Sequence, residues 1–359
     1  MKSTLVRAAG CGTLLAIAIA AAVAAPPSAK SNPLRVSMYA DNGVVEVVVT
    51  NTSNKIARVP KWQLPSETPQ GELFQVSLDG KAVEYHGQMV KRGVPTAEDF
   101  AILRPGQSHR YLVDLTDSYD MGRKGQYLVT LVSPLQHASL SGGEMLRSQS
   151  GLPMLLQSAP LRTWVDDAAA KSSEAARKPT SGGAATVVNG VSYVGCSTTQ
   201  ISTAGSAVNS ARSYAENAKG YLNAGSVGPR YTTWFGAYTS SRYGNARQHF
   251  TSIDTAMDQS GGQVKINCGC NQSYYAYVYP NRPYEIFVCR AFWTAPLTGT
   301  DSKAGTLIHE MSHFDIVANT DDVVYGQSGA KSLAISDPAG AGRNADSHEY
   351  FAENTPFQN

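Results

Sequence analysis

Short segments of alternating apolar and polar residues fill the first half of the chain. Between Leu34 and Pro160 they include the runs V-V-E-V-V-V-T, F-Q-V-S-L, Y-L-V-D-L and Q-Y-L-V-T-L-V, separated by turn sequences such as D-N-G and L-D-G-K. A period of two is typical of antiparallel strands with one buried face. We therefore predict an all-β, immunoglobulin-like sandwich of roughly seven strands over residues 33–165.

The pattern changes to a helical one in the second half. An alanine-rich stretch covers residues 199–223, and Phe250, Ile253 and Met257 give the segment 240–259 one apolar face. Strand-like runs V-K-I-N-C, Y-A-Y-V-Y and E-I-F-V-C follow, and the rest of the chain is again helical in pattern. Residues 192–359 are thus expected to form an α+β domain.

Two further segments differ in composition from these domains. Residues 1–25 combine a basic start, an apolar run and a small-residue site before two prolines, which is typical of a secretory signal peptide. Residues 166–191 are small and polar and predict a flexible linker. No later run reaches the length of a membrane span. We expect a secreted, extracellular protein that does not bind membranes.

Charge and cysteine content narrow the function classes. The net charge is +2, without a basic run that could neutralise a series of phosphates, so nucleic acid is not an expected partner. Four cysteines, an even set, lie in the exported second domain and predict two disulfides: Cys196, Cys268, Cys270 and Cys289. If Cys268 and Cys270 share a strand they pair poorly with each other, and both remaining connectivities stay open. The alternative is a Cys-x-Cys metal site.

Residues 305–314, G-T-L-I-H-E-M-S-H-F, carry the strongest chemical signal. Four residues are about one helical turn, so His309 and His313 share a face and can bind one Zn²⁺ ion. Glu310 lies on the adjoining flank, where it can take a proton from water and pass it to a leaving amine. This pattern predicts a zinc endopeptidase with one Zn²⁺ per chain, acting on proteins and peptides.

A catalytic zinc site needs a third protein ligand and an open position. Asn319 stands where the long metzincin pattern has histidine, which excludes that class. A distant glutamate would make a thermolysin-like site, and an aspartate after the V-A-N-T-D-D turn would make a His-His-Asp site. The residues alone leave four candidates: Asp321, Asp322, His348 and Glu349.

The sequence around this motif resembles a known family. H-E-M-S-H followed by T-D-D-V-V-Y-G and N-A-D-S-H-E-Y-F-A-E-N is similar to the peptidyl-Lys metalloendopeptidases of the deuterolysin (aspzincin) family, and the resemblance covers nearly all of Ser192–Asn359. It implies Asp322 as third ligand, Tyr325 as the residue that stabilises the transition state, and cleavage on the amino side of lysine. It further implies lysine recognition by Asp346 and Glu349, and the disulfides Cys196–Cys268 and Cys270–Cys289.

Two positions carry alternatives within this resemblance. Asn319 replaces the family's glycine, and because asparagine tolerates a left-handed backbone we expect the turn to persist, with Asp321 as the fallback ligand. We expect Tyr325 on the same helical face as Asp322. The spacing of Asp346 and Glu349 fits a helix capping box equally well.

Together these features predict a precursor. A signal peptide, a β-sandwich prodomain and a linker would precede a zincin-like metallopeptidase domain, which would be monomeric when mature and have its own prodomain as a partner in cis. Lys171 and Lys178 in the linker would allow self-processing. The alternatives are a broad-specificity deuterolysin-like or thermolysin-like peptidase and, in another class, a secreted binding protein with a structural zinc site.

Overall fold

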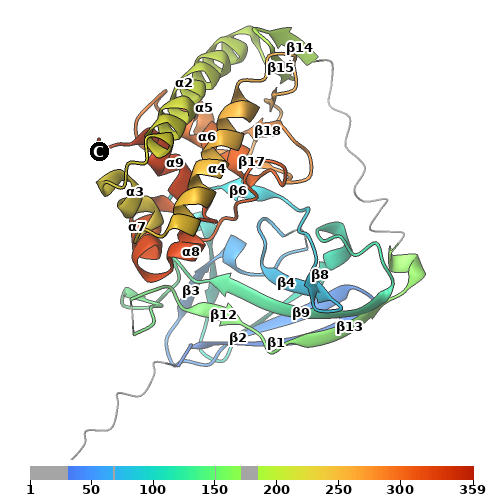
Figure 1. Cartoon of the computed structure of the whole chain (residues 1–359). Helices are drawn as coiled ribbons and strands as arrows, with labels where there is room; N and C mark the ends of the chain where they lie inside the picture. Colours follow the sequence, from blue (N-terminus) through green and yellow to red (C-terminus); the bar gives the residue numbers. More distant parts are fainter. Residues whose placement is uncertain (1–30, 68, 150, 171–184) are drawn as a thin grey trace, which may run out of the picture.

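The computed structural model describes residues 31–67, 69–149, 151–170 and 185–359 (Figure 1). The proposed signal peptide and the linker residues Lys171 and Lys178 lie outside these ranges. We refer to residues 31–170 as the N-terminal region and to residues 185–359 as the C-terminal region. Figure 1 shows strands gathered in the first and helices in the second.

Strands dominate the N-terminal region, and they are distributed over three antiparallel sheets. The first contains β1 (Leu34–Asp41), β2 (Val44–Asn51) and β8 (Ser108–Asp114). The second contains β11 (Glu144–Met145), β10 (Ser139–Leu140), β3 (Ala57–Pro60) and β7 (Phe100–Leu103). The third contains β12 (Leu155–Gln157), β9 (Gly125–Pro134), β4 (Phe74–Leu78) and β5 (Lys81–Ala82), and β13 (Leu161–Val165) also pairs with β9. An immunoglobulin-like arrangement of these strands stays a prediction.

The β1–β2 hairpin shows why the alternating pattern produces strands here. Asn42 and Gly43 both have positive φ angles, 48° and 88°, which matches the tight turns that join twisted strands. The turn sets the register, with Asp41 opposite Val44. Every second residue of β2 then faces the core, where Val45, Val47 and Val49 are fully buried.

The C-terminal region contains a mixed six-stranded sheet. Its strands are, in spatial order, β14 (Ala185–Val188), β15 (Val191–Val194), β16 (Lys265–Asn267), β18 (Glu285–Val288), β17 (Ala276–Val278) and β6 (Met89–Lys91). Strand β14 begins inside the predicted linker 166–191, because its residues pair with β15. The sheet therefore starts before the predicted boundary at Ser192. Its last strand, β6, comes from the N-terminal region.

Helices cover this sheet and form the rest of the region. They are α2 (Thr198–Asn223), α3 (Pro229–Phe235), α4 (Ser240–Met257), α5 (Arg290–Thr294), α6 (Lys303–His313), α7 (Gly326–Ser336), α8 (Pro338–Ala341) and α9 (Ala345–Glu353). Helix α6 contacts α2, α4 and α9. The buried face of α2 is mostly alanine, which lets neighbouring helices approach closely. All residues of α6 are consequently buried.

Two disulfides close the loops beside the sheet. Cys196 is bonded to Cys268, and Cys270 is bonded to Cys289, with Cα–Cα distances of 5.1 and 4.8 Å. This confirms the connectivity implied by the family resemblance. Cys268 and Cys270 both follow the end of β16, so their loop is tied to the ends of β15 and β18. Within the described ranges, no helix has the length and apolar character needed to span a membrane.

Candidate active site

Helix α6 carries the H-E-x-x-H residues into the core of the C-terminal region. Ser302 caps the helix by accepting a hydrogen bond from the backbone N–H of Gly305 at 2.9 Å. Ser302 is itself held by Glu353, whose carboxylate accepts from the serine hydroxyl at 2.8 Å. The first turn is thus fixed to α9. The side chains one and two turns later, His309 and His313, are fully buried.

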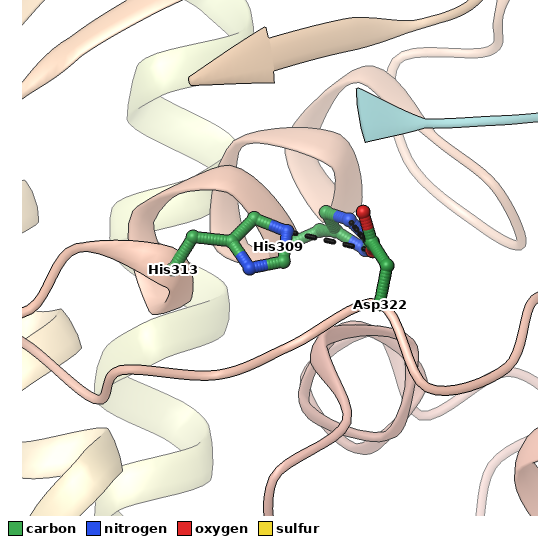
Figure 2. A group of neighbouring side chains, drawn as sticks. All are labelled: His309, His313 and Asp322. Carbon is green, nitrogen blue, oxygen red and sulfur yellow. Dashed lines mark ion pairs between the residues drawn. The ribbon is translucent and has the colours of Figure 1, made fainter. Parts of the chain in front are cut away.

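Three ligand atoms of a metal-binding type converge beside α6 (Figure 2). Oδ1 of Asp322 lies 3.1 Å from Nε2 of His309 and 3.5 Å from Nε2 of His313. None of these three buried atoms has a hydrogen-bond partner in the described part of the chain. Two imidazole nitrogens and one carboxylate oxygen are a ligand set that suits a zinc ion. We call His309, His313 and Asp322 the metal cluster.

The outer nitrogens of the two histidines differ in their surroundings. Nδ1 of His313 donates a hydrogen bond to the carbonyl of Thr320 at 2.7 Å. Nδ1 of His309 makes no hydrogen bond to a described residue but lies 2.9 Å from Oδ1 of Asp346. A carbonyl or carboxylate beside Nδ1 favours the tautomer that leaves Nε2 free to bind a metal. Asp346 is therefore placed to support the metal cluster, a role that the sequence did not indicate.

The loop after α6 places Asp322, but not Asp321, beside the two histidines. Asn319 adopts a left-handed conformation with φ of 47°, as expected for the residue in the family's glycine position. The backbone of Asp321 is then bonded to Arg343 and Ala345, and its carboxylate lies 3.8 Å from the Arg343 guanidinium. Asp321 is not part of the described groups of converging ligand atoms. The fallback ligand is thus not supported.

His348 is also placed away from the metal cluster. Its Nδ1 lies 2.9 Å from the carbonyl of Asn344, and its Nε2 lies 3.0 Å from Nδ1 of His249. The two imidazoles stack, and Phe235 packs against the pair. Burial, followed by the effect of His249, lowers the pKa of His348 to about 3. This histidine is a neutral part of the core.

Glu310 carries a fully buried carboxylate on α6. Neither of its oxygens accepts a hydrogen bond from any described residue. Burial raises the pKa of Glu310 to about 7, although His309 and His313 oppose this shift. A carboxylate with a pKa near neutrality can both accept and return a proton at physiological pH. The geometry therefore suits the proton-transfer role suggested by the sequence.

Tyr325 reaches the site by a route that differs from the expected one. Residues 322–325 are not helical, and Tyr325 is the N-cap residue of α7 in an extended conformation. The expectation that it shares a helical face with Asp322 was therefore wrong. Its hydroxyl donates to the carbonyl of Val90 at 3.0 Å. The side-chain amide of Gln136 holds its backbone through two hydrogen bonds, at 2.8 and 2.5 Å.

A second polar cluster adjoins the metal cluster. Nζ of Lys91 lies 2.5 Å from Oε2 of Glu349, 3.5 Å from Oδ1 of Asp301 and 3.8 Å from Oδ1 of Asp346. We call these three acidic residues the lysine pocket. The N-cap of α9 is Asn344, without a capping side-chain bond, so the capping-box alternative for Asp346 and Glu349 is wrong.

Charges within this pocket compensate one another. Burial alone would lower the pKa of Lys91, but Glu349, Asp346 and Asp301 raise it well above its ordinary value, so its ammonium stays charged. At Asp346 burial is outweighed by Lys91 and His309, and the pKa is lowered. At Glu349 burial dominates and raises the pKa. The sequence analysis identified neither Lys91, which lies in the N-terminal region, nor Asp301, which lies just before α6.

Comparisons with known proteins show which family this chain resembles. A family model described as lysine-specific metallo-endopeptidase matches residues 221–353. A protein of Aeromonas hydrophila named "Extracellular protease" is 39% identical over 355 residues, which cover 97% of this chain and 99% of that protein. The peptidyl-Lys metalloendopeptidase of Pleurotus ostreatus is 51% identical over 166 residues, 46% of this chain and 97% of its own length. A solved zinc peptidase from Grifola frondosa is 46% identical, covers 46% of this chain and 100% of its own, and has a TM-score of 0.44.

The matched segment contains every residue of the metal cluster together with Glu310, Tyr325 and Glu349. The similarity to the Aeromonas protein extends over almost the whole of both chains, including the N-terminal region. The chain therefore belongs to the family of lysine-specific metallo-endopeptidases, the aspzincins, and is a metal-dependent peptide-bond hydrolase.

Proposed function

We propose that the chain is a secreted zinc endopeptidase, made as a precursor, that cleaves peptide bonds on the amino side of lysine. One observation carries the specificity: the ammonium of Lys91 lies against Glu349 and Asp346, directly beside the metal cluster. A pocket that accommodates one lysine side chain of this protein can accommodate the lysine of a substrate. The bond before that lysine would then lie near the metal.

We further propose that one Zn²⁺ per chain is held by His309, His313 and Asp322. Their buried, unpartnered atoms support this ligand set. Zinc bound there would polarise the carbonyl of the bond to be cut and lower the pKa of water. Thr320 and Asp346 would keep both imidazoles in the orientation required for binding.

Two side chains of the protein carry out the remaining steps, proton transfer and stabilisation of the oxyanion. Glu310 takes a proton from the attacking water at its carboxylate and delivers it to the leaving amine, in keeping with its pKa of about 7. The hydroxyl of Tyr325 donates a hydrogen bond to the oxyanion that develops from the attacked carbonyl. Its present hydrogen bond to a backbone carbonyl, that of Val90, supports this role.

Lysine fits the pocket better than arginine for a physical reason. A buried ammonium needs a nearby carboxylate, and Glu349 supplies one at hydrogen-bond distance. The rings of Tyr275 and Tyr350 lie 5.2 and 5.9 Å from the ammonium and add cation–π attraction. Arginine carries a longer, planar group with a different set of donors, so it does not match a pocket built around a compact charge.

We propose that residues 33–165 act as a prodomain in cis and that the mature part is a monomer. The Pleurotus relative supports a two-part precursor, since nearly all of its length corresponds to less than half of this chain. The sequence of residues 1–25 and the name of the Aeromonas relative support secretion. Self-processing would occur in the linker, at Lys171 and Lys178.

Two alternatives can now be compared with this proposal. A binding protein with a structural metal is set aside, because the chain belongs to a peptidase family and neither oxygen of Glu310 has a hydrogen-bond partner among the described residues. A broad-specificity peptidase remains the competing hypothesis, and it differs only in what the lysine pocket does.

Digestion of an unfolded protein tests the proposal. The activated enzyme is incubated with a reduced, denatured substrate, and the new N-termini are identified by mass spectrometry. We expect lysine at the N-terminal end of nearly every new peptide, no cleavage in the presence of a chelator, and recovery after zinc is added. The Glu310→Gln variant serves as the control and should lose about two to four orders of magnitude in kcat. A mixed set of N-termini would support the broad-specificity alternative instead.

A further inference from the structure

Asp301 is the carboxylate of the lysine pocket that has the most access to solvent. Its side chain is 43% exposed, whereas those of Asp346 and Glu349 are 2% and 0% exposed. A cleft of about 1370 Å³ between the two regions is lined by Asp301, but by neither of the other two carboxylates. Asp301 therefore lies where the pocket opens towards solvent.

The number of carboxylates in the pocket matches the chemistry of an ammonium group. An ammonium has three N–H donors and no acceptor. Oε2 of Glu349 accepts a hydrogen bond from Nζ of Lys91 at 2.5 Å. Oxygens of Asp301 and Asp346 lie within ion-pair distance of the same Nζ, at 3.5 and 3.8 Å. A lysine in this pocket thus meets one carboxylate for each N–H, and Asp301 supplies the one on the solvent side.

One face of α9 carries four polar residues at the spacing i, i+3, i+4 and i+7, namely Asp346, Glu349, Tyr350 and Glu353. The third of them orients the side chain of Asp301. The hydroxyl of Tyr350 donates to Oδ1 of Asp301 at 2.7 Å, and this is the oxygen that faces Lys91. Burial, followed by the negative charges of Asp346 and Glu349, raises the pKa of Tyr350 well above its ordinary value. The hydroxyl therefore stays protonated and remains a donor.

Glu353, one turn further along α9, holds the backbone of Asp301. Its Oε2 accepts from the N–H of Asp301 at 3.2 Å, and its Oε1 accepts from the N–H of Ser302 at 2.9 Å. These bonds hold Asp301 at a φ of 51°, a left-handed conformation that is uncommon for residues other than glycine. Gly305 leaves space for the Glu353 carboxyl group, because a Cβ atom at that position would overlap Oε1.

Glu353 differs from the carboxylates of the lysine pocket in its charge. Burial, followed by the negative charge of Glu349, raises the pKa of Glu353 to about 9. It is therefore largely neutral at pH 7 and adds little negative charge beside the ammonium. Its contribution is to the geometry of Asp301.

We propose that Asp301 is a specificity-determining residue that pairs with the ammonium of the substrate lysine, and that Glu353 is a positioning residue that acts through Asp301. This inference rests on the proposed cleavage before lysine. The carboxylate of Asp301 is partly exposed, so water screens its charge and its contribution is smaller than that of the buried Glu349. The pairing exists before the peptide bond is attacked as well as during the attack, so Asp301 acts mainly on KM.

Hydrolysis of two matched peptides tests these roles. The first peptide is Ala-Ala-Val-Lys-Ala-Gly, and the second has norleucine in place of lysine, which keeps the four-carbon chain and removes the ammonium. Asp301→Asn, Glu353→Gln and the double variant are compared with the parent enzyme, each activated from the zinc-loaded full chain. Asp258→Asn, at the exposed C-cap residue of α4, is the matched control.

We expect Asp301→Asn to raise KM for the lysine peptide about fivefold and to leave kcat/KM for the norleucine peptide unchanged. Glu353→Gln should act in the same direction, and the double variant should be no worse than Asp301→Asn, because both residues act through one carboxylate. Asp258→Asn should match the parent enzyme with both peptides. An equal loss with both peptides, or no change with either, overturns the role of the residue concerned. Equal cleavage of both peptides by the parent enzyme contradicts the lysine specificity itself.

The stability of the intact chain decides the result if a variant does not mature. The full chain with Glu310→Gln is denatured in urea with and without Asp301→Asn, both with Lys91 present and after Lys91→Met. We expect Asp301→Asn to lower the urea midpoint only while Lys91 is present, because the carboxylate otherwise has no ammonium to pair with. Equal shifts in both chains would show that Asp301 is structural only and would overturn the inference.

Discussion

The metal cluster and the lysine pocket are neighbours, and they differ in whether the chain itself supplies a positive charge. In the metal cluster, the converging atoms of His309, His313 and Asp322 have no hydrogen-bond partner among the described residues. In the lysine pocket, Lys91 supplies the cation from within the chain. Asp346 contacts both, through Nδ1 of His309 and through the ammonium. The first cluster therefore offers its ligand atoms to a metal ion, whereas the second already holds a cation that belongs to the chain.

Removal of the third ligand should have the largest effect. We expect Asp322→Ala to lose bound zinc and all measurable peptidase activity, because two imidazoles alone do not make a stable zinc site. Asp321→Ala is the matched control and should retain both, since its carboxylate lies near Arg343. Zinc content after gel filtration and hydrolysis of a lysine peptide are the measurements. If Glu349→Ala alone loses zinc, the metal cluster is assigned wrongly.

Substitutions in the lysine pocket should separate the roles of two of its carboxylates, those of Asp346 and Glu349. Glu349 is the nearer one to the ammonium, and Asp346 is the nearer one to His309. Glu349→Gln should lower kcat/KM for lysine peptides about 100-fold or more, because a buried charge loses its partner. Asp346→Asn should in addition weaken zinc binding about 10- to 100-fold.

The measurements are kcat/KM for paired lysine and arginine peptides, zinc affinity by competition with a chelator, and a melting curve for each variant. A purely structural role for both residues would instead lower the melting temperature and leave the preference for lysine unchanged. Equal zinc affinity in the two variants would show that Asp346 supports the metal ligands no more than Glu349 does.

The stacked pair of His348 and His249 is a third buried polar cluster. Unlike the metal cluster and the lysine pocket, it holds no positive charge. The pKa of His348 is about 3 in the folded protein, against an ordinary value of 6.5. Between these values the unfolded chain binds a proton that the folded protein does not, so stability decreases as the pH falls from 6.5. In the pH range where only the unfolded chain is protonated at this residue, the free energy of unfolding falls by about 1.4 kcal/mol per pH unit. His348→Gln should make the acid side of the stability curve shallower.

Urea denaturation of the Glu310→Gln chain, with and without His348→Gln, between pH 4 and 8 measures this effect as a difference of two curves. Identical pH dependence in both chains would show that His348 is protonated in the folded protein as readily as in the unfolded one.

The features that the sequence could predict depend on local spacing. His309 and His313 are one helical turn apart, so any helix brings them together, and the left-handed turn at Asn319 follows from the conformational freedom of asparagine. The strands and helices around them also follow from periodicity. The third ligand needed the family resemblance, because spacing alone did not distinguish Asp322 from its neighbours.

The features that were missed depend on contacts between distant segments. Residues 322–325 are irregular because Asp321 and Val324 are bonded to the segment before α9, so the helical placement of Tyr325 failed. Strand β14 has the sequence A-T-V-V at the end of a small, polar stretch, and it pairs with β15. Lys91 and Glu349 are 258 positions apart, and nothing in the M-V-K segment indicates a buried ammonium. Such pairs are determined by the arrangement of the two regions.

The placement of Lys91 also constrains how this protein can evolve. Because Lys91 occupies the acidic pocket in the folded chain, any change in the side chain that the pocket prefers also changes its fit to residue 91. A substitution at Asp346 or Glu349 that favours another side chain would leave the buried ammonium of Lys91 with fewer partners. Residue 91 and the pocket should therefore covary across the family, so the identity of residue 91 in a relative would reveal which residue that relative cleaves before.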